Sequence, residues 1–188
     1  MTNLINLDDY KAYKNIESDA DDTILSRIVS SVNSYVVNYC SRTILNYHTN
    51  NKVEYFDGNT DSVYLDETPI TSIVSVKISS DGGVTKTDLV ENTDFFVDNE
   101  NGLIISKYGK FISSDTKFKS LEVTYTGGYA KTPEDLKIAC LDLVEYYRKE
   151  QYIPSRTMGN SSMVHISSDD SKKIPNYISR ILDMYRLM

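Results

Sequence analysis

Residues 124–137, TYTGGYAKTPEDLK, join an alternating strand pattern to a helical pattern. Thr132 and Pro133 are typical of a helix start, because a threonine side chain can accept a hydrogen bond from the first free N–H groups and proline is tolerated in the first turn. The adjacent glycines Gly127 and Gly128 raise the question of a phosphate site, since glycine-rich loops between a strand and a helix can cradle phosphates.

Two features of the same stretch argue against a phosphate there. The Walker pattern requires a glycine directly before its lysine, and here Ala130 precedes Lys131. Glu134 and Asp135 place two carboxylates in the first helical turn, at the positive end of the helix dipole, where the phosphate would sit. We therefore interpret the two glycines as a hinge between two parts of the fold.

The segment before this hinge has the pattern of an antiparallel β module. Short runs rich in Tyr and Val alternate apolar and polar residues over residues ~52–126, and turn-forming residues separate them. Asp81-Gly82-Gly83 and Asn101-Gly102 supply residues that tolerate the positive φ angles of tight hairpins. The pattern predicts about six strands, in a module bounded by residues 52–128.

The segments on either side of the β module have a helical pattern. We expect a short helix at Leu7–Ile16 and a long one from about Asp21 to Ser41, with Ser18 or Asp19 as its N-cap. A further helix at residues ~133–151 has a broad apolar face, which favours burial against the long N-terminal helix.

These elements define an α+β fold with three parts. Residues 1–50 and 132–151 form a helical body that carries the inserted β module, and residues 152–188 form a polar, extended or mobile linker followed by a short C-terminal helix. Such a helix cannot bury its own apolar face, so it must pack on the body or on a partner. The residues predicted to dock on a partner are Ile174, Tyr177, Ile178, Ile181 and Tyr185.

The composition is that of an ordinary globular domain, with 40% hydrophobic and 25% charged residues. The formal net charge of −7 does not suit tight binding to a nucleic-acid backbone, which depends on Lys and Arg. The chain has 15 tyrosines and no tryptophan, and tyrosine is enriched in protein interfaces. No apolar run is long enough for a membrane span, and the N-terminal residues lack a signal pattern, so we expect synthesis in the cytoplasm.

No motif indicates catalysis, a cofactor or a metal. Cys40 and Cys140 sit in apolar helical patterns without a nearby second ligand, which predicts small buried side chains. His48 and His165 have no companion at ligand spacing, and we interpret them as surface or loop histidines. The sequence therefore predicts no catalytic residue, no cofactor-binding residue and no metal ligand.

The order of the elements resembles that of the head–tail connector proteins of tailed bacteriophages, also called adaptor or head-completion proteins. Residues 7–44 are similar to the N-terminal portion of that family, which opens with a Leu-x-x-x-Lys turn, continues through an acidic step and ends a long helix near Tyr-x-x-Arg. The counterparts here are Leu7, Lys11, Asp19-Ala20-Asp21-Asp22, Tyr39 and Arg42. Residues 121–151 are similar to the family's strand–Gly–Tyr–Pro–helix junction, and residues 64–78 and 94–104 resemble its strand elements.

The resemblance, which covers residues 7–151, implies a structural adaptor without catalytic activity. Family members form a homo-oligomeric ring, expected here to be a dodecamer, beneath the portal protein at the capsid–tail junction of the virion. The ring joins the portal to the tail or the next neck protein and encloses the channel through which DNA passes without specific binding. An acidic channel lining, if the net charge lies there, would repel DNA and let it slide.

Two other classes of function stay open from the sequence. A stand-alone binding module would use the β module to present a protein or ligand surface and would remain monomeric. An enzyme with an unrecognised acidic site would show a deep pocket with convergent carboxylates.

Overall fold

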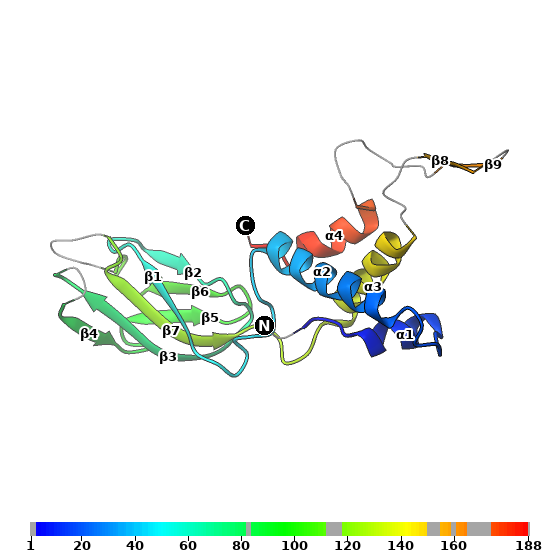
Figure 1. The fold of residues 1–188 in the computed structure, drawn as a ribbon. Coiled ribbons are helices and arrows are strands. Elements are labelled where there is room, and N and C mark those ends of the chain that lie inside the picture. The colour runs from blue at the N-terminus through cyan, green and yellow to red at the C-terminus, as the bar shows by residue number, and fades with distance from the viewer. Residues whose placement is uncertain are drawn as a thin grey trace. The chain divides into compact units, whose positions relative to one another are not determined.

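The computed structural model describes residues 3–81, 84–111, 118–149, 155–158, 161–164 and 174–187. Helices and antiparallel strands are both present, so the predicted α+β class is confirmed. The chain divides into two compact units, which we call the helical unit (Met1–Arg42 with Lys131–Met188) and the β unit (Thr43–Ala130). The elements of each unit are labelled in Figure 1.

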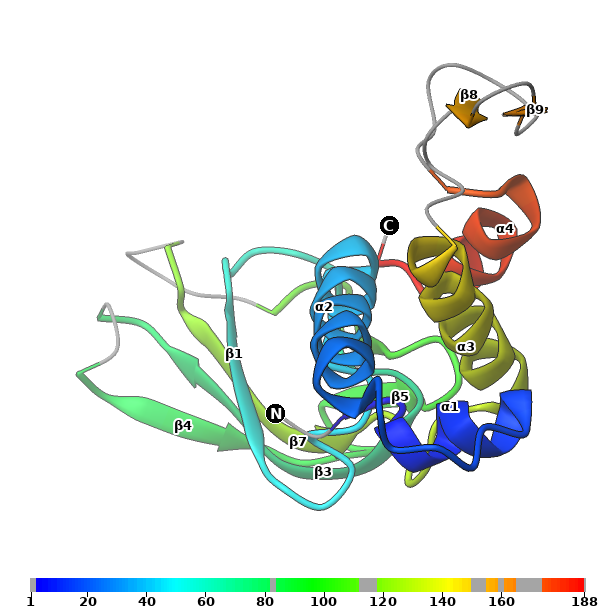
Figure 2. The ribbon, with the colours of Figure 1, turned by 45° about the vertical axis from the view of Figure 1, so that its right-hand side comes forward.

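The helical unit contains the four helices that the sequence predicted. They are α1 (Leu7–Lys14), α2 (Asp22–Cys40), α3 (Glu134–Arg148) and α4 (Asn176–Met184). The long helix α2 packs against α3, as expected from their apolar faces, and Figure 2 shows the two side by side. Residues of α2 at a spacing of three or four are buried, as a helix with one apolar stripe requires: Leu25, Val29, Val32, Val36 and Cys40.

Two of the predicted helix caps are wrong. The N-cap of α2 is Asp21, not Ser18 or Asp19, and its side chain makes no capping hydrogen bond. The N-cap of α3 is Pro133, and the Thr132 hydroxyl instead donates to the carbonyl oxygen of Leu4, at 2.6 Å. Thr132 therefore ties the start of α3 to the N-terminal segment, because a long-range acceptor has replaced the local one.

The N-terminal segment is held on α2 by a buried asparagine. Asn33 accepts from the backbone N–H groups of Leu4 and Ile5, at 2.8 and 3.1 Å, through its Oδ1 atom. Its Nδ2 atom donates to the carbonyl oxygens of Ile5 and Val29. An amide buried with all these partners satisfies backbone groups that would otherwise be costly to bury.

The β unit is a sandwich of two antiparallel sheets. Sheet A has the order β1 (Lys52–Phe56), β7 (Leu121–Gly127), β3 (Ile70–Ser79), β4 (Lys86–Leu89). Sheet B has the order β2 (Ser62–Tyr64), β6 (Leu103–Ser106), β5 (Phe95–Asp98). The β unit thus contains seven strands, whereas the sequence pattern predicted about six. The predicted hairpins β3–β4 and β5–β6 are confirmed, although Gly82 and Gly83 lie outside the described residues.

The sandwich core lies between the two sheets. Alternate residues of each strand point inward, as the two-residue period of a β-strand dictates. The buried members are Val63, Leu65, Ile70, Val76, Phe95, Ile104, Phe111, Leu121, Val123 and Tyr125. The remaining alternate residues form an outer face on each sheet.

The two glycines of the opening stretch lie where three loops of the β unit meet. Gly128 has φ +89°, and a Cβ atom there would lie 2.3 Å from the carbonyl oxygen of Ile44. A Cβ atom on Gly127 would lie 2.1 Å from the carbonyl oxygen of Glu67. The N–H groups of Gly128 and Tyr129 donate to the carbonyl oxygens of Pro69 and Ile44. Both glycines are therefore required by close contact with the backbone of neighbouring loops.

A buried carboxylate stabilises the loops around Gly127 and Gly128. Glu67 is 1% exposed, and its carboxylate accepts hydrogen bonds from the backbone N–H groups of Thr43 and Ile44 and from the Thr43 hydroxyl. Thr43 and Ile44 are the first residues of the β unit after the helical residues. Glu67 thus holds the entry of the chain beside its exit at Gly127 and Gly128.

The segment predicted as a linker contains a short hairpin. Strands β8 (Ser155–Met158) and β9 (Ser161–Val164) pair antiparallel. The sequence signal for this pairing was the Gly-Asn dipeptide between the strands, which is typical of two-residue hairpin turns. Most of the rest of the predicted linker, including His165, lies outside the described residues. Within the described ranges, none of the helices combines the length and the apolar character that crossing a bilayer demands.

The free energy of unfolding is expected to fall by about 2 kcal/mol between pH 7 and pH 3 through Glu145 alone. Partial burial raises the pKa of Glu145, but hydrogen bonds from Lys149 and from the buried Tyr10 outweigh burial and lower the pKa to about 2 from a usual 4.5. A carboxylate with a depressed pKa in the folded state contributes stability above pH 4.5, and this stability is lost as the pH falls toward 2.

Chemical denaturation of the wild type and of Glu145→Gln at both pH values checks this expectation. The variant should be less stable at pH 7 and should lose about 2 kcal/mol less than the wild type on acidification. Equal losses in the two proteins would show that another group carries the pH dependence.

Candidate docking surface on the helical unit

Two of the five predicted docking residues are part of the core of the helical unit. Helix α4 packs against α3 and α2 in its own chain. Ile174 and Ile178 are buried there together with Leu182. The chain itself therefore covers the apolar surface of Ile174 and Ile178 in this structure, and a partner contact through these two residues stays a prediction. Helical periodicity identified the apolar face of α4 and could not tell which surface covers it.

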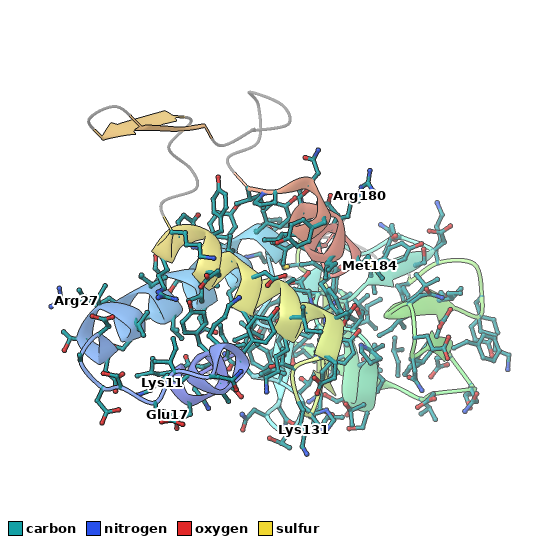
Figure 3. All side chains as sticks on the ribbon, turned by 90° about the vertical axis from the view of Figure 1, so that its right-hand side faces the viewer. Lys11, Glu17, Arg27, Lys131, Arg180 and Met184 are labelled. Atoms are coloured by element: carbon teal, nitrogen blue, oxygen red, sulfur yellow. The ribbon has the colours of Figure 1, made fainter. Side chains whose placement is uncertain are left out.

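The other three predicted residues lie along one side of α4. Tyr177 is 53% exposed, and Ile181 and Tyr185 are half-buried. They follow one another at a spacing of four residues, which places them on one face of the helix. Arg180 and Met184, labelled in Figure 3, are exposed on the same helix.

Tyrosine–carboxylate hydrogen bonds join this side of α4 to α3 and α1. The hydroxyl of Tyr185 donates to Asp135, at 2.6 Å, and the hydroxyl of Tyr13 in α1 donates to Asp142, at 2.9 Å. Tyr177 also hydrogen-bonds to Asp142. Three helices therefore contribute to one continuous surface.

An exposed isoleucine lies between these two carboxylates. Ile138 is 47% exposed and stands on α3 at a helical spacing from Asp135 and Asp142, so the three residues share a face. We call this surface the α3–α4 stripe. It consists of Tyr13, Asp135, Ile138, Asp142, Tyr177, Ile181 and Tyr185.

The electrostatics of the stripe keep the tyrosine rings in place. The hydrogen bond to Asp142, with partial burial, raises the pKa of Tyr13. Burial and the negative charge of Asp142 raise the pKa of Tyr177. Both phenols thus stay protonated donors whose hydroxyl groups are anchored while their rings remain exposed. A surface that is ordered before binding loses less conformational entropy when a partner covers it.

The sequence alone did not indicate Tyr13, Ile138 or Asp142 as members of this surface. They belong to two further helices, and only the fold brings them beside α4. One signal was present, since Ile138 is an isoleucine on a side of α3 that otherwise carries charged residues.

The other candidates from the sequence have structural environments. Burial raises the pKa of the Cys40 thiol to about 11 and that of the Cys140 thiol to about 12, so both remain protonated at neutral pH. In the β unit, Nδ1 of His48 lies 3.3 Å from the carbonyl oxygen of Gly128. Among the described residues, no group of three His, Cys, Asp or Glu side chains could hold a metal ion. The stripe itself offers aromatic and apolar side chains for packing on a partner, and polar groups for hydrogen bonding.

A comparison with protein families defines the class of the chain as a structural protein of the bacteriophage particle, located at the head–tail junction. The family model that matches is "Head completion protein", over residues 3–188, and the chain belongs to this family. The resemblance that the sequence indicated is confirmed.

One relative and three solved structures extend the comparison. The chain is 36% identical to the head completion protein of Escherichia phage T5 over 67 residues, which span 35% of this chain and 38% of that protein. Its fold is similar to a chain of "Neck of empty GTA particle computed with C6 symmetry", with a TM-score of 0.58, 12% identity, and coverage of 98% of this chain and 90% of the other.

Two other solved structures contain similar chains. A chain of "Virion of native gene transfer agent (GTA) particle" gives a TM-score of 0.58 at 13% identity, with the same coverage of 98% and 90%. A chain of "Neck of native GTA particle computed with C12 symmetry" gives a TM-score of 0.51 at 14% identity, covering 100% and 94% of the two chains. At these identities the likeness is one of fold.

Proposed function

We propose that the chain is an adaptor subunit of a bacteriophage neck, which forms a ring between the portal protein and the tail or the next neck protein. Membership of the head completion family and the similar fold of chains in necks of sixfold and twelvefold symmetry support the ring. The neck of twelvefold symmetry favours a ring of twelve copies, a dodecamer. The ring encloses the channel for DNA.

The observation that carries the proposal is the α3–α4 stripe. Three of its large side chains, Tyr13, Ile138 and Tyr177, are 42%, 47% and 53% exposed although charged side chains flank them. Exposed Tyr anchors with satisfied hydroxyl groups are typical of residues that dominate binding energy. We propose the portal protein as the partner that covers the stripe.

The mechanism is non-covalent. Neighbouring copies pack in the ring, the stripe docks on the portal, and the opposite end of the ring receives the tail-side protein. With a net charge of −7, the chain repels DNA phosphates more than it attracts them, so DNA passes without specific binding.

Electron microscopy of the protein mixed with portal particles of its phage tests the proposal. The expected result is a ring at the distal end of the portal. Protein that stays monomeric beside an intact portal would overturn the adaptor function and would instead fit a stand-alone binding module.

A further inference from the structure

The β unit has two exposed outer faces on opposite sides of its sandwich. Because Phe56, Val123 and the other inward residues fill the core, their strand neighbours point away from it. We call the outer face of sheet A the A face and the outer face of sheet B the B face. Their properties differ and are complementary.

The A face contains a shallow cationic pocket of about 210 Å³. Four strands and the loop before β7 line it, with three lysines and a single carboxylate. The lining residues are Tyr55, Lys77, Ser79, Lys86, Lys119, Ser120 and Glu122. In a chain with a net charge of −7, three lysines around one pocket are a local excess of positive charge.

Only part of this charge is neutralised within the β unit. Lys86 pairs with Glu122 at 2.5 Å, and Lys77 lies 3.7 Å from Asp88. Lys119 makes no ion pair among the described residues. The lysines of the pocket can therefore pair with further carboxylates from a partner. On β1, Tyr55 lines the pocket and Val53 lies two residues away on the same face, and both side chains are about half exposed.

The B face is apolar at its centre. Phe96 and Ile105 are direct cross-strand partners, as are Tyr64 and Leu103. Tyr64, Phe96 and Ile105 are 66%, 44% and 40% exposed. The outer face of an antiparallel sheet is ordinarily polar, and a contiguous exposed apolar patch marks an interaction site.

The rim of the B face is acidic. Residues 91–101, ENTDFFVDNEN, contain β5 and its flanking turns and include four carboxylates without any Lys or Arg. Hydrogen bonds from Asn101 lower the pKa of Asp98, which therefore stays ionised. The nearby cation is Lys107, which lies 5.8 Å from the ring centre of Phe96. The acidic members of the rim are Glu91, Asp94, Asp98 and Glu100.

We propose that the A face of one copy packs on the B face of the next copy, so that the lysine pocket receives the acidic rim and the β1 residues Val53 and Tyr55 cover Phe96 and Ile105. Charge complementarity selects a second copy as the occupant, because one chain supplies both the cationic pocket and the acidic rim. A contact between two different faces of the same chain is heterologous, and such contacts form a ring when the rotation from one copy to the next closes. This inference rests on the proposed ring and names the surfaces that form it.

Site-directed crosslinking in phage particles tests the contact. The two natural cysteines are buried, so a cysteine introduced on an exposed face is the reactive thiol. Tyr55→Cys reports on the A face and Ile105→Cys on the B face. A short bis-maleimide should link the two variants into dimers when both are present in the same particles, and should leave each variant unlinked when it is present alone.

A charge-reversal series gives a second readout. Lys119→Glu should lower the yield of linked dimers about tenfold, in line with the loss of a close charge pair. Glu100→Lys in the neighbouring copies should restore the yield, and the matched control Lys131→Glu, on the helical unit, should leave it unchanged. Figure 3 labels Lys131.

The outcomes separate this inference from the adaptor function. Imaging of the same particles shows whether a ring is present. A ring without mixed dimers, or dimers formed by either cysteine variant alone, would overturn the A-to-B contact and keep the adaptor. Mixed dimers without a ring would keep the contact and overturn the ring. A yield of linked dimers that changes neither with Lys119→Glu nor with Glu100→Lys would overturn the pairing of the pocket with the acidic rim.

Discussion

Gly128→Ala is expected to lower the free energy of unfolding by about 3–5 kcal/mol, which is at the upper end for a single substitution. The added Cβ atom would lie 2.3 Å from the carbonyl oxygen of Ile44, a distance that no Cβ contact tolerates. That oxygen is fixed, because it accepts the hydrogen bond from the N–H group of Tyr129 at 2.8 Å. The side chain would also require a φ of +89°, which alanine rarely adopts.

Gly109→Ala is the matched control for this prediction. Gly109 has nearly the same φ, +90°, and a Cβ atom there would meet nothing within 4 Å. The control therefore measures backbone strain without a clash, and about 1–2 kcal/mol is expected. Chemical denaturation of both variants gives the difference. Equal costs for Gly109→Ala and Gly128→Ala would show that the loops around Ile44 can move aside.

The same residues show what the sequence could predict at the junction. The double glycine and the helix start after it were enough to predict a junction between a strand and a helix. The buried carboxylate of Glu67 was not predictable, because its partners Thr43 and Ile44 are more than twenty residues away in the chain. Hydrogen bonds over such separations are a property of the fold and leave no local pattern.

Local periodicity predicted the elements more successfully than their partners. The four helices and the hairpins β3–β4 and β5–β6 follow from spacing and turn residues. Strands β1 and β2 follow one another in the sequence and lie in different sheets, because β1 pairs with β7 and β2 with β6. Nothing in either strand specifies that choice.

The docking residues on α4 illustrate the same limit. An apolar residue at helical spacing has the same appearance whether its own chain or another protein covers it. Deletion of residues 171–188 would remove the C-terminal helix, and with it Ile178 and Leu182 from the core of the helical unit. Loss of portal binding by the truncated protein would then report unfolding, so point substitutions on the exposed stripe are needed.

The double variant Ile138→Ala/Tyr177→Ala is expected to weaken binding to the portal by at least about 2 kcal/mol, roughly 30-fold in Kd, since a few anchor residues carry most of the binding energy of an interface. Both side chains are about half exposed, so the free protein loses little burial. Alanine is also the best helix former, so α3 and α4 should keep their structure. Asp142 retains its hydrogen bond from Tyr13 in the variant.

Titration of portal particles with each protein measures this effect, and a thermal melt verifies that the variant is folded. Arg180→Ala is the matched control, because Arg180 is exposed on α4 and lies outside the stripe. It should bind the portal as the wild type does. Tyr13→Phe separates two contributions within the stripe, since it keeps the ring and removes the hydroxyl that donates to Asp142. If the ring must be held in place for docking, Tyr13→Phe should weaken binding by a few-fold, less than the double variant. Unchanged binding by a folded Ile138→Ala/Tyr177→Ala variant would move the portal contact to another surface of the protein.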